Sequence, residues 1–264
     1  MVIDAHCHAG SGDGMTGPWD TRADLTDYLR RCTAAGIDRS VIFAALGPDY
    51  AAGNEEVARI VQAHRGRLMG FVFLDGRMPE AQVQQQLARH VLLHGFRGIK
   101  CHKHDAPISR AICRQAALWR LPVLYDVMGD VASIELFARE YPGVNFIIPH
   151  LGSFADDWKA QLAIVDHLQR HPNVYTDTAG CRRFDAVVEA VRRGGAHKVL
   201  FGSDGPWLHP GLELEKIRLL GLPPAQAALV CGGNLLRLIG QHTGVRRQLF
   251  MRYRSQVAVL AAAV

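Results

Sequence analysis

The chain has 264 residues, of which 48% are hydrophobic and 21% are charged, a composition typical of a folded globular protein and not of a disordered one. The formal net charge is +5, but residues 241–264 hold four arginines and no acidic residue, so residues 1–240 carry 26 basic and 25 acidic residues. A main body with a net charge near zero argues against a nucleic-acid partner.

The six cysteines are scattered along the chain without a Cys-x-x-Cys pair. This spacing favours reduced thiols in the cytoplasm over a disulfide scaffold. No basic segment followed by an apolar segment opens the chain, and no apolar run approaches the ~18 residues of a membrane span. The sequence therefore predicts a cytoplasmic protein without an export signal or a membrane span.

Eight short runs rich in β-branched or aromatic residues predict buried strands. They cover residues 2–6, 40–45, 68–73, 98–101, 122–126, 145–148, 174–177 and 199–202. Longer amphipathic stretches predict helices between them, because they are bounded by residues that begin or end helices. These stretches cover residues 21–35, 54–64, 79–94, 109–119, 131–140, 154–169, 184–193 and 224–239.

Eight consecutive strand-helix units predict an α/β fold of the (β/α)8 TIM-barrel type. A doubly wound sheet is disfavoured, because it would usually show fewer units and a glycine-rich phosphate turn after its first strand, where this chain has HCH. We expect one domain over residues 1–240. Residues 241–264, basic and then apolar, form a short C-terminal extension that packs either on the barrel or on another subunit.

The ends of the predicted strands are rich in polar side chains. Catalytic groups of a TIM barrel lie at the carboxyl ends of its strands, so these residues are candidates for a site. In chain order they are Asp4, His6 and His8, Lys100, His102 and His104, Asp126, His150, Asp177 and Asp204.

The first strand places its two histidines on one face. Because side chains alternate along a strand, Asp4, His6 and His8 are expected to point to the barrel axis and Cys7 away from it. Two imidazoles spaced about 7 Å apart along a strand can reach one cation at about 2.1 Å. The pair alone proves little, since a His-x-His motif arises easily by chance.

Six segments resemble, in order, the landmarks of the amidohydrolase superfamily, in the branch related to aminocarboxymuconate semialdehyde decarboxylase. They are MVIDAHCHAG, GFRGIKCHKH, LPVLYDVMG, NFIIPHLGSF, KVLFGSDGPW and GGNLLRLIG. The resemblance extends over residues 1 to about 240. It implies a TIM barrel that holds a divalent metal and acts on a small-molecule substrate.

The resemblance also implies which residues hold the metal. His6, His8, His150 and Asp204 match the family pattern, whereas Asp126 stands where the family usually has a histidine. A carboxylate can also bind zinc, manganese or iron, so Asp126 remains a candidate ligand. Zinc is the principal expectation, with manganese or iron as alternatives.

The remaining candidates concern the substrate. Lys100, His102 and Arg182 are predicted to bind it, Arg182 because it follows the seventh strand and suits an anionic ligand. Two other interpretations remain open. Lys100 could instead be carboxylated and bridge two metals, and the glycine-rich segment at 11–18 has the composition of a mobile lid.

The leading hypothesis is a metal-dependent hydrolase in which the metal activates a water, Asp204 accepts its proton and His150 orients the water or polarises the substrate. One alternative is a decarboxylase of an aromatic or dienoic acid. Another is an oxidative enzyme that uses iron, and a third is a metal-free binding module. The substrate and the oligomeric state, including a homo-oligomer, remain open.

Overall fold

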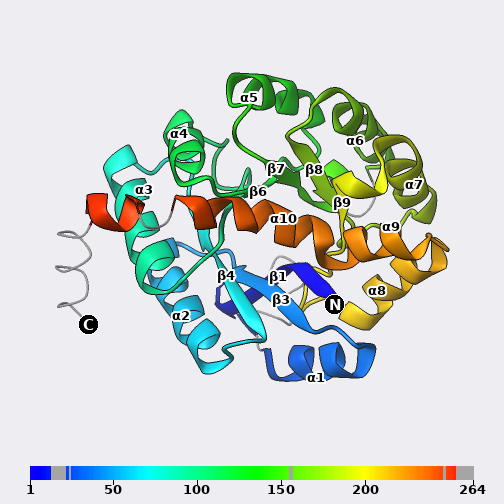
Figure 1. Ribbon diagram of the computed structural model, residues 1–264, viewed down its shortest axis with the longest axis horizontal. Helices are drawn as coiled ribbons and strands as arrows, with labels where there is room; N and C mark the ends of the chain where they lie inside the picture. Colours follow the sequence, from blue (N-terminus) through cyan, green and yellow to red (C-terminus); the bar gives the residue numbers. More distant parts are fainter. Residues whose placement is uncertain (13–21, 24, 155–156, 246–247, 254–264) are drawn as a thin grey trace.

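The computed structural model describes residues 1–12, 22–23, 25–154, 157–245 and 248–253. Its centre is a sheet of nine strands, of which β2 pairs antiparallel with the end of β1 and the other eight are parallel (Figure 1). The strands are β1 (Ile3–Ser11), β2 (Arg22–Ala23), β3 (Arg39–Ala44), β4 (Leu68–Phe73), β5 (Gly98–His102), β6 (Val123–Asp126), β7 (Phe146–Ile148), β8 (Val174–Asp177) and β9 (Val199–Leu200).

The eight parallel strands close into a barrel. The segment that begins with β9 joins β1 through hydrogen bonds from Ala5 N to Phe201 O at 2.9 Å and from Asp204 N to His6 O at 2.8 Å. Closure removes the exposed sheet edges. The predicted TIM barrel is therefore confirmed.

The helices surround the barrel (Figure 1). They are α1 (Leu25–Ala35), α2 (Tyr50–Ala63), α3 (Glu80–Leu87), α4 (Arg110–Trp119), α5 (Ile134–Glu140), α6 (Trp158–Arg170), α7 (Phe184–Glu189), α8 (Pro210–Leu219), α9 (Pro224–Ala228) and α10 (Asn234–Gly240). Three π-helical segments extend helices, namely η1 (Ala88–Leu93), η4 (Ala190–Gly194) and η6 (Leu229–Gly233). The side chains of Asp49, Ser109 and Asp157 cap α2, α4 and α6 by accepting backbone N–H groups.

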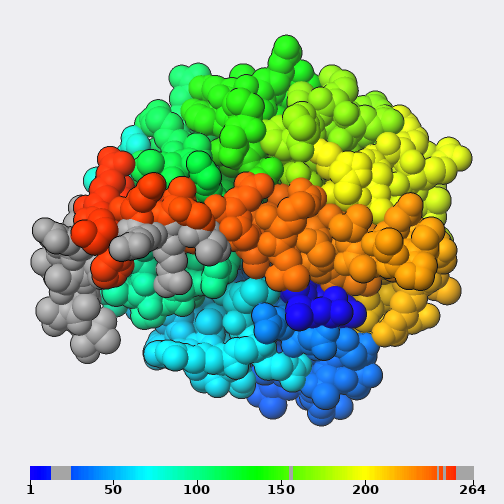
Figure 2. All heavy atoms as spheres, viewed as in Figure 1, coloured from blue at the N-terminus to red at the C-terminus, as the bar shows by residue number. Residues whose placement is uncertain are grey.

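The helix that completes the eighth unit differs from the prediction. It is α8, which follows Asp204 directly, whereas residues 224–240 form α9, η6 and α10 in succession. The Asn234 side chain donates to the carbonyl groups of Ala196 and Val199, at the amino end of β9. This end of the barrel is covered by α10, as the orange segment in Figures 1 and 2 shows.

The C-terminal extension contacts the barrel as far as it is described. Leu249 and Tyr253 are buried, and the Tyr253 ring stacks on Trp119 of α4 with 5.2 Å between ring centroids. Most of the suggested lid at 11–18 and residues 254–264 of the extension lie outside the described residues. None of the helices in the described parts of the chain is both long and apolar enough to cross a membrane.

Candidate metal centre

A small cavity of about 80 Å³ lies where the carboxyl ends of the strands converge. It brings together seven of the residues predicted for the site. Its lining consists of His6, His8, Lys100, His102, Asp126, His150, Phe154, Asp204 and Trp207. Asp177 and Arg182, which were also predicted, are not among the residues that line this cavity, and Arg182 is exposed.

The first strand and the segment after β9 contribute one group of candidate ligands. One oxygen of Asp204, Oδ1, lies 3.3 Å from His6 Nε2 and 3.5 Å from His8 Nε2. The ligand atoms of these three buried side chains all lie within 4.8 Å of one another. Such a set of two imidazoles and a carboxylate is one that divalent transition metals accept.

Hydrogen bonds at the far side of two imidazole rings orient them. His8 Nδ1 lies 3.0 Å from the Ala44 carbonyl oxygen, and His150 Nδ1 lies 2.7 Å from the Ala179 carbonyl oxygen. Because a carbonyl only accepts, each Nδ1 must carry the hydrogen and each Nε2 of the neutral ring keeps its lone pair. Both lone pairs are therefore available at the cavity.

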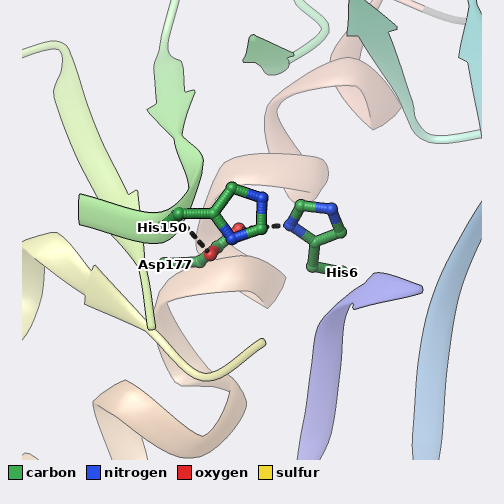
Figure 3. A group of neighbouring side chains, drawn as sticks. All are labelled: His6, His150 and Asp177. Carbon is green, nitrogen blue, oxygen red and sulfur yellow. Dashed lines mark hydrogen bonds and ion pairs between the residues drawn. The ribbon is translucent and has the colours of Figure 1, made fainter. Parts of the chain in front are cut away.

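Asp177, at the end of β8, contacts two of the histidines (Figure 3). Its Oδ2 lies 2.9 Å from His6 Nδ1, and its Oδ1 accepts the backbone N–H of His150 at 3.1 Å. Burial would raise the pKa of this carboxyl, but the neighbouring His6 and His150 keep it below its ordinary value. The carboxylate form therefore fixes the His6 ring as well as the position of His150.

The protonation of the first-strand histidines suits a metal. Burial is the largest influence on both rings, and it lowers the pKa of His6 and, more strongly, that of His8. Both rings are thus neutral at physiological pH. His6 Nε2 is also buried without a hydrogen-bond partner among the described residues. A cation at this position would satisfy that nitrogen, so the residues present fit a divalent metal.

Asp126 lies on the other side of the cavity. Its Oδ2 is 3.3 Å from His102 Nε2 and 3.5 Å from His150 Nε2. Burial would raise the pKa of this carboxyl, but the hydrogen bond from His102 and the nearby charges lower it well below its ordinary value. Asp126 therefore faces His150 and His102, whereas Asp204 faces the two first-strand histidines.

His102 has the opposite tautomer from His8 and His150. Its Nδ1 accepts the backbone N–H of His104 at 3.0 Å, so its hydrogen must reside on Nε2. That N–H points toward Asp126. His102 therefore acts as a donor in this arrangement and has no lone pair to offer at the cavity.

Lys100 is the basic side chain of the site. It is 0% exposed, and its Nζ has no hydrogen-bond partner among the described residues. The ammonium lies 4.9 Å from the centre of the Phe43 ring. Burial lowers the pKa of Lys100, while the surrounding carboxylates, first Asp126 and then Asp204, act in the opposite direction.

The backbone is strained at two of the candidate residues. His150 and Asp204 both have a φ of 58°, and Leu151 has a φ of 52°. Non-glycine residues in the left-handed region cost on the order of 1 kcal/mol each and gather at functional sites. A close approach also requires glycine at position 202, since a Cβ there would lie 3.0 Å from the Cβ of His6.

The predicted orientation of Asp4 is wrong. Its carboxylate accepts from the Tyr28 hydroxyl of α1 at 2.8 Å and from the backbone N–H of Ser203 at 2.9 Å, and it does not line the cavity. The pairing of β1 with β3 shifts register between Asp4 and Cys7. This irregularity breaks the simple alternation of side chains, so Asp4 and His6 do not share a face.

Comparison with protein families places the chain among known proteins. The family model described as amidohydrolase matches residues 3–241. The chain belongs to this amidohydrolase family. The resemblance inferred from the six sequence motifs is therefore confirmed. None of the curated proteins compared with this amidohydrolase matches its sequence.

Solved structures share the fold of this amidohydrolase at low sequence identity. The 2,6-dihydroxybenzoate decarboxylase from Rhizobium is 15% identical with a TM-score of 0.69, over 91% of this chain and 99% of that chain. The 5-carboxyvanillate decarboxylase from Sphingomonas paucimobilis is 14% identical with a TM-score of 0.72, over 90% and 98%.

A third structure contains a metal. It is a dihydroxybenzoic acid decarboxylase from Polaromonas sp. JS666 with bound manganese and the inhibitor 2-nitroresorcinol, and it is 15% identical with a TM-score of 0.68 over 90% of this chain and 96% of that chain. At this level of identity the likeness establishes the TIM-barrel fold.

Proposed function

We propose that this amidohydrolase is a metal-dependent decarboxylase of a small aromatic acid. The observation that carries the proposal is the unpartnered Lys100 ammonium, which is buried beside Phe43 in a cavity also lined by Phe154 and Trp207. A buried cation without a partner is costly and calls for an anion. Aromatic walls around that cation suit a flat ring that carries anionic oxygens.

The metal would be held by His6, His8 and Asp204, and His150 and Asp126, which line the same cavity, would be further ligand candidates. When bound, it would supply positive charge that stabilises anionic oxygens of the substrate. Lys100 would bind a second anionic oxygen, and His102 would hold Asp126 in its ionised form. Imidazoles with carboxylates suit both zinc and manganese.

The reaction requires one bond to break and one proton to arrive. The bond between the ring carbon and the carboxylate breaks, its electron pair stays on the ring, and carbon dioxide leaves. We assign Asp204 to take up a proton from the solvent and deliver it to that ring carbon, which returns Asp204 to its carboxylate form. In the transition state, negative charge spreads over the ring and the oxygens attached to it, and Lys100 would stabilise this charge.

The decarboxylase neighbours support this choice over hydrolysis. Hydrolysis stays a second candidate, because Asp204 beside a metal could also accept a proton from water. The same site would then act on an ester, a lactone or an amide. The two reactions differ in whether carbon dioxide is released.

The test is a substrate screen with protein loaded separately with zinc and manganese. Hydroxylated benzoates and dienoic acids are assayed for carbon dioxide, and esters, lactones and amides for hydrolysis. We expect carbon dioxide from at least one aromatic acid, and a loss of about 10³-fold in kcat for Asp204→Asn because the proton donor is removed. Asp185→Asn is the control, since Asp185 is exposed and pairs with Arg183.

Three outcomes would contradict the proposal. Hydrolysis without carbon dioxide would favour the rival reaction, and full kcat in Asp204→Asn would remove this residue from the chemistry. Activity found only with iron under oxygen would favour the oxidative alternative.

A further inference from the structure

A second group of metal-type ligands lies on the helical layer, away from the cavity. Glu55 belongs to α2, His90 to the π-helical segment η1, and His94 follows that segment directly. One ligand atom from each lies within 4.8 Å of the others. His90 Nε2 is 3.4 Å from Glu55 Oε1, and the two imidazole centroids are 5.6 Å apart.

Three imidazole nitrogens of this group are buried without hydrogen-bond partners among the described residues. His90 is 0% exposed, and neither of its ring nitrogens is hydrogen-bonded within the described parts of the chain. His94 Nε2 is also buried without a hydrogen-bond partner among the described residues. Buried polar atoms nearly always find a partner, so three orphaned nitrogens at one place call for a ligand that the protein itself does not supply.

The charges in this group match those of a metal site. Burial lowers the pKa of His90 to about 4, which leaves a neutral ring with a lone pair at physiological pH. Burial would raise the pKa of Glu55, but the Arg89 guanidinium keeps it below its ordinary value, so the carboxylate is ionised. Two neutral imidazoles and one carboxylate form a ligand set typical of zinc.

Arg89 orients the carboxylate. Its Nη2 donates to Glu55 Oε2 at 3.1 Å, and its Nε makes a close hydrogen bond to Oε1. Carboxylates that bind metals are usually hydrogen-bonded in this way, and each oxygen keeps a further lone pair. About a third of the Glu55 side chain is exposed, which leaves a path for an ion to enter.

A similar group elsewhere has its carboxylate and one imidazole paired, although His167 Nδ1 is buried there without a hydrogen-bond partner among the described residues. Glu135, His167 and His171 also bring their ligand atoms within 4.8 Å. There, however, Glu135 Oε2 is 2.9 Å from His171 Nε2 and 3.1 Å from Arg170 Nη1. The carboxylate and the His171 ring thus already have partners, and this group serves as an internal control.

We propose that Glu55, His90 and His94 bind one divalent transition ion of the zinc class, separate from the candidate metal centre. The ion would join α2 to η1, which are neighbouring segments of the outer layer. Three protein ligands leave a fourth position for a water molecule. None of the three residues lines the cavity at the strand ends.

The test counts zinc ions in a chain whose first centre has been disabled. In His6→Ala/His8→Ala, zinc titration is expected to leave one equivalent bound. His94→Ala in that background should remove it, and Glu55→Gln should weaken it by at least about 10-fold, because the charged ligand is lost. His171→Ala, in the control group, should leave it unchanged.

A second measurement uses the full chain with both centres intact. Zinc should raise the Tm of the wild-type protein more than that of His94→Ala, since an ion that binds only the folded state stabilises it. Circular dichroism verifies that each variant is folded. Zinc binding that is absent from the His6→Ala/His8→Ala background, or that survives His94→Ala in full, would overturn the proposal.

Discussion

Lys100 and Lys198 are buried lysines at opposite ends of the barrel, 0% and 6% exposed. Lys198, beside the amino end of β9, donates to the carbonyl oxygens of His171 at 2.7 Å, Pro172 at 2.7 Å and Val174 at 3.0 Å. Lys100, on β5, has no hydrogen-bond partner among the described residues. Burial lowers the pKa of both ammonium groups.

The difference separates a lysine that stabilises the fold from one that is available to a ligand. Three carbonyl acceptors replace the hydrogen bonds that Lys198 would make to water, whereas none of the described residues around Lys100 accepts a hydrogen bond from it. Carboxyl ends of TIM-barrel strands carry function and amino ends carry stability. Substituting each lysine by methionine, which has a similar length and no charge, tests this comparison.

The largest effect is expected for Lys100→Met. Removing the cation that binds the substrate anion should lower kcat/KM by about 10²- to 10³-fold, equivalent to roughly 3–4 kcal/mol of transition-state stabilisation. The free energy of unfolding should stay the same or rise, because an unpartnered buried charge is removed. Steady-state kinetics and denaturant unfolding measure the two effects, and a loss of stability with unchanged kinetics would contradict the comparison.

Lys198→Met should show the reverse pattern. The variant loses three hydrogen bonds from a charged group, which should lower the free energy of unfolding by about 3 kcal/mol and the Tm by roughly 6–10 °C. Its kcat should remain that of the wild-type protein, because the side chain lies at the other end of the barrel. Calorimetry and kinetics provide the measurement. A variant as stable as the wild type would show that the carbonyl groups find other partners.

The smallest effect concerns pH. The pKa of Lys198 is lowered from 10.5 to about 8 in the folded protein. Between these two values the unfolded chain binds a proton that the folded chain does not, so this lysine makes stability rise with pH. Lys198→Met lacks that contribution, and its deficit relative to the wild type should therefore grow by about 1–2 kcal/mol across the window, after allowance for partial exposure.

Comparing the variant with the wild-type protein also corrects for other groups that titrate in this pH range. Buried cysteines such as Cys7 and Cys101 have raised pKa values and affect both proteins equally. Comparing the two unfolding curves at each pH cancels their contribution. A difference that stays constant from pH 8 to 10.5 would show that Lys198 keeps its ordinary titration in the folded protein.

Much of the candidate site could be predicted from the residues at the ends of the strands. Polar residues that close apolar runs identified His6, His8, Asp126 and Asp204, because a closed parallel barrel must bring its carboxyl ends together. Asp177 is also a polar residue at a strand end. Its contacts with His6 and His150, however, depend on side-chain directions that sequence spacing does not reveal. The same holds for the opposite tautomer of His102, which depends on the backbone N–H of His104.

Two errors show where local patterns fail. Residues 224–239 have a helical pattern, but the helix of the eighth unit is α8, and α9 to α10 cover the other end of the barrel instead. Helical periodicity reports an apolar face and not which part of the barrel that face covers. The orientation of Asp4 was predicted wrongly, because the alternation of side chains along a strand does not reveal the register shift in β1.

The sequence by itself determined the barrel, the order of its strands and the end at which the candidate ligands gather, since strand length, alternation and the clustering of carboxyl ends are properties of the backbone. Only the tertiary structure decided that Asp204 faces His6 and His8 while Asp126 faces His150 and His102. It also decided which of two buried lysines has partners. Those facts depend on contacts between side chains distant in sequence, whose packing is specified only once the barrel has closed.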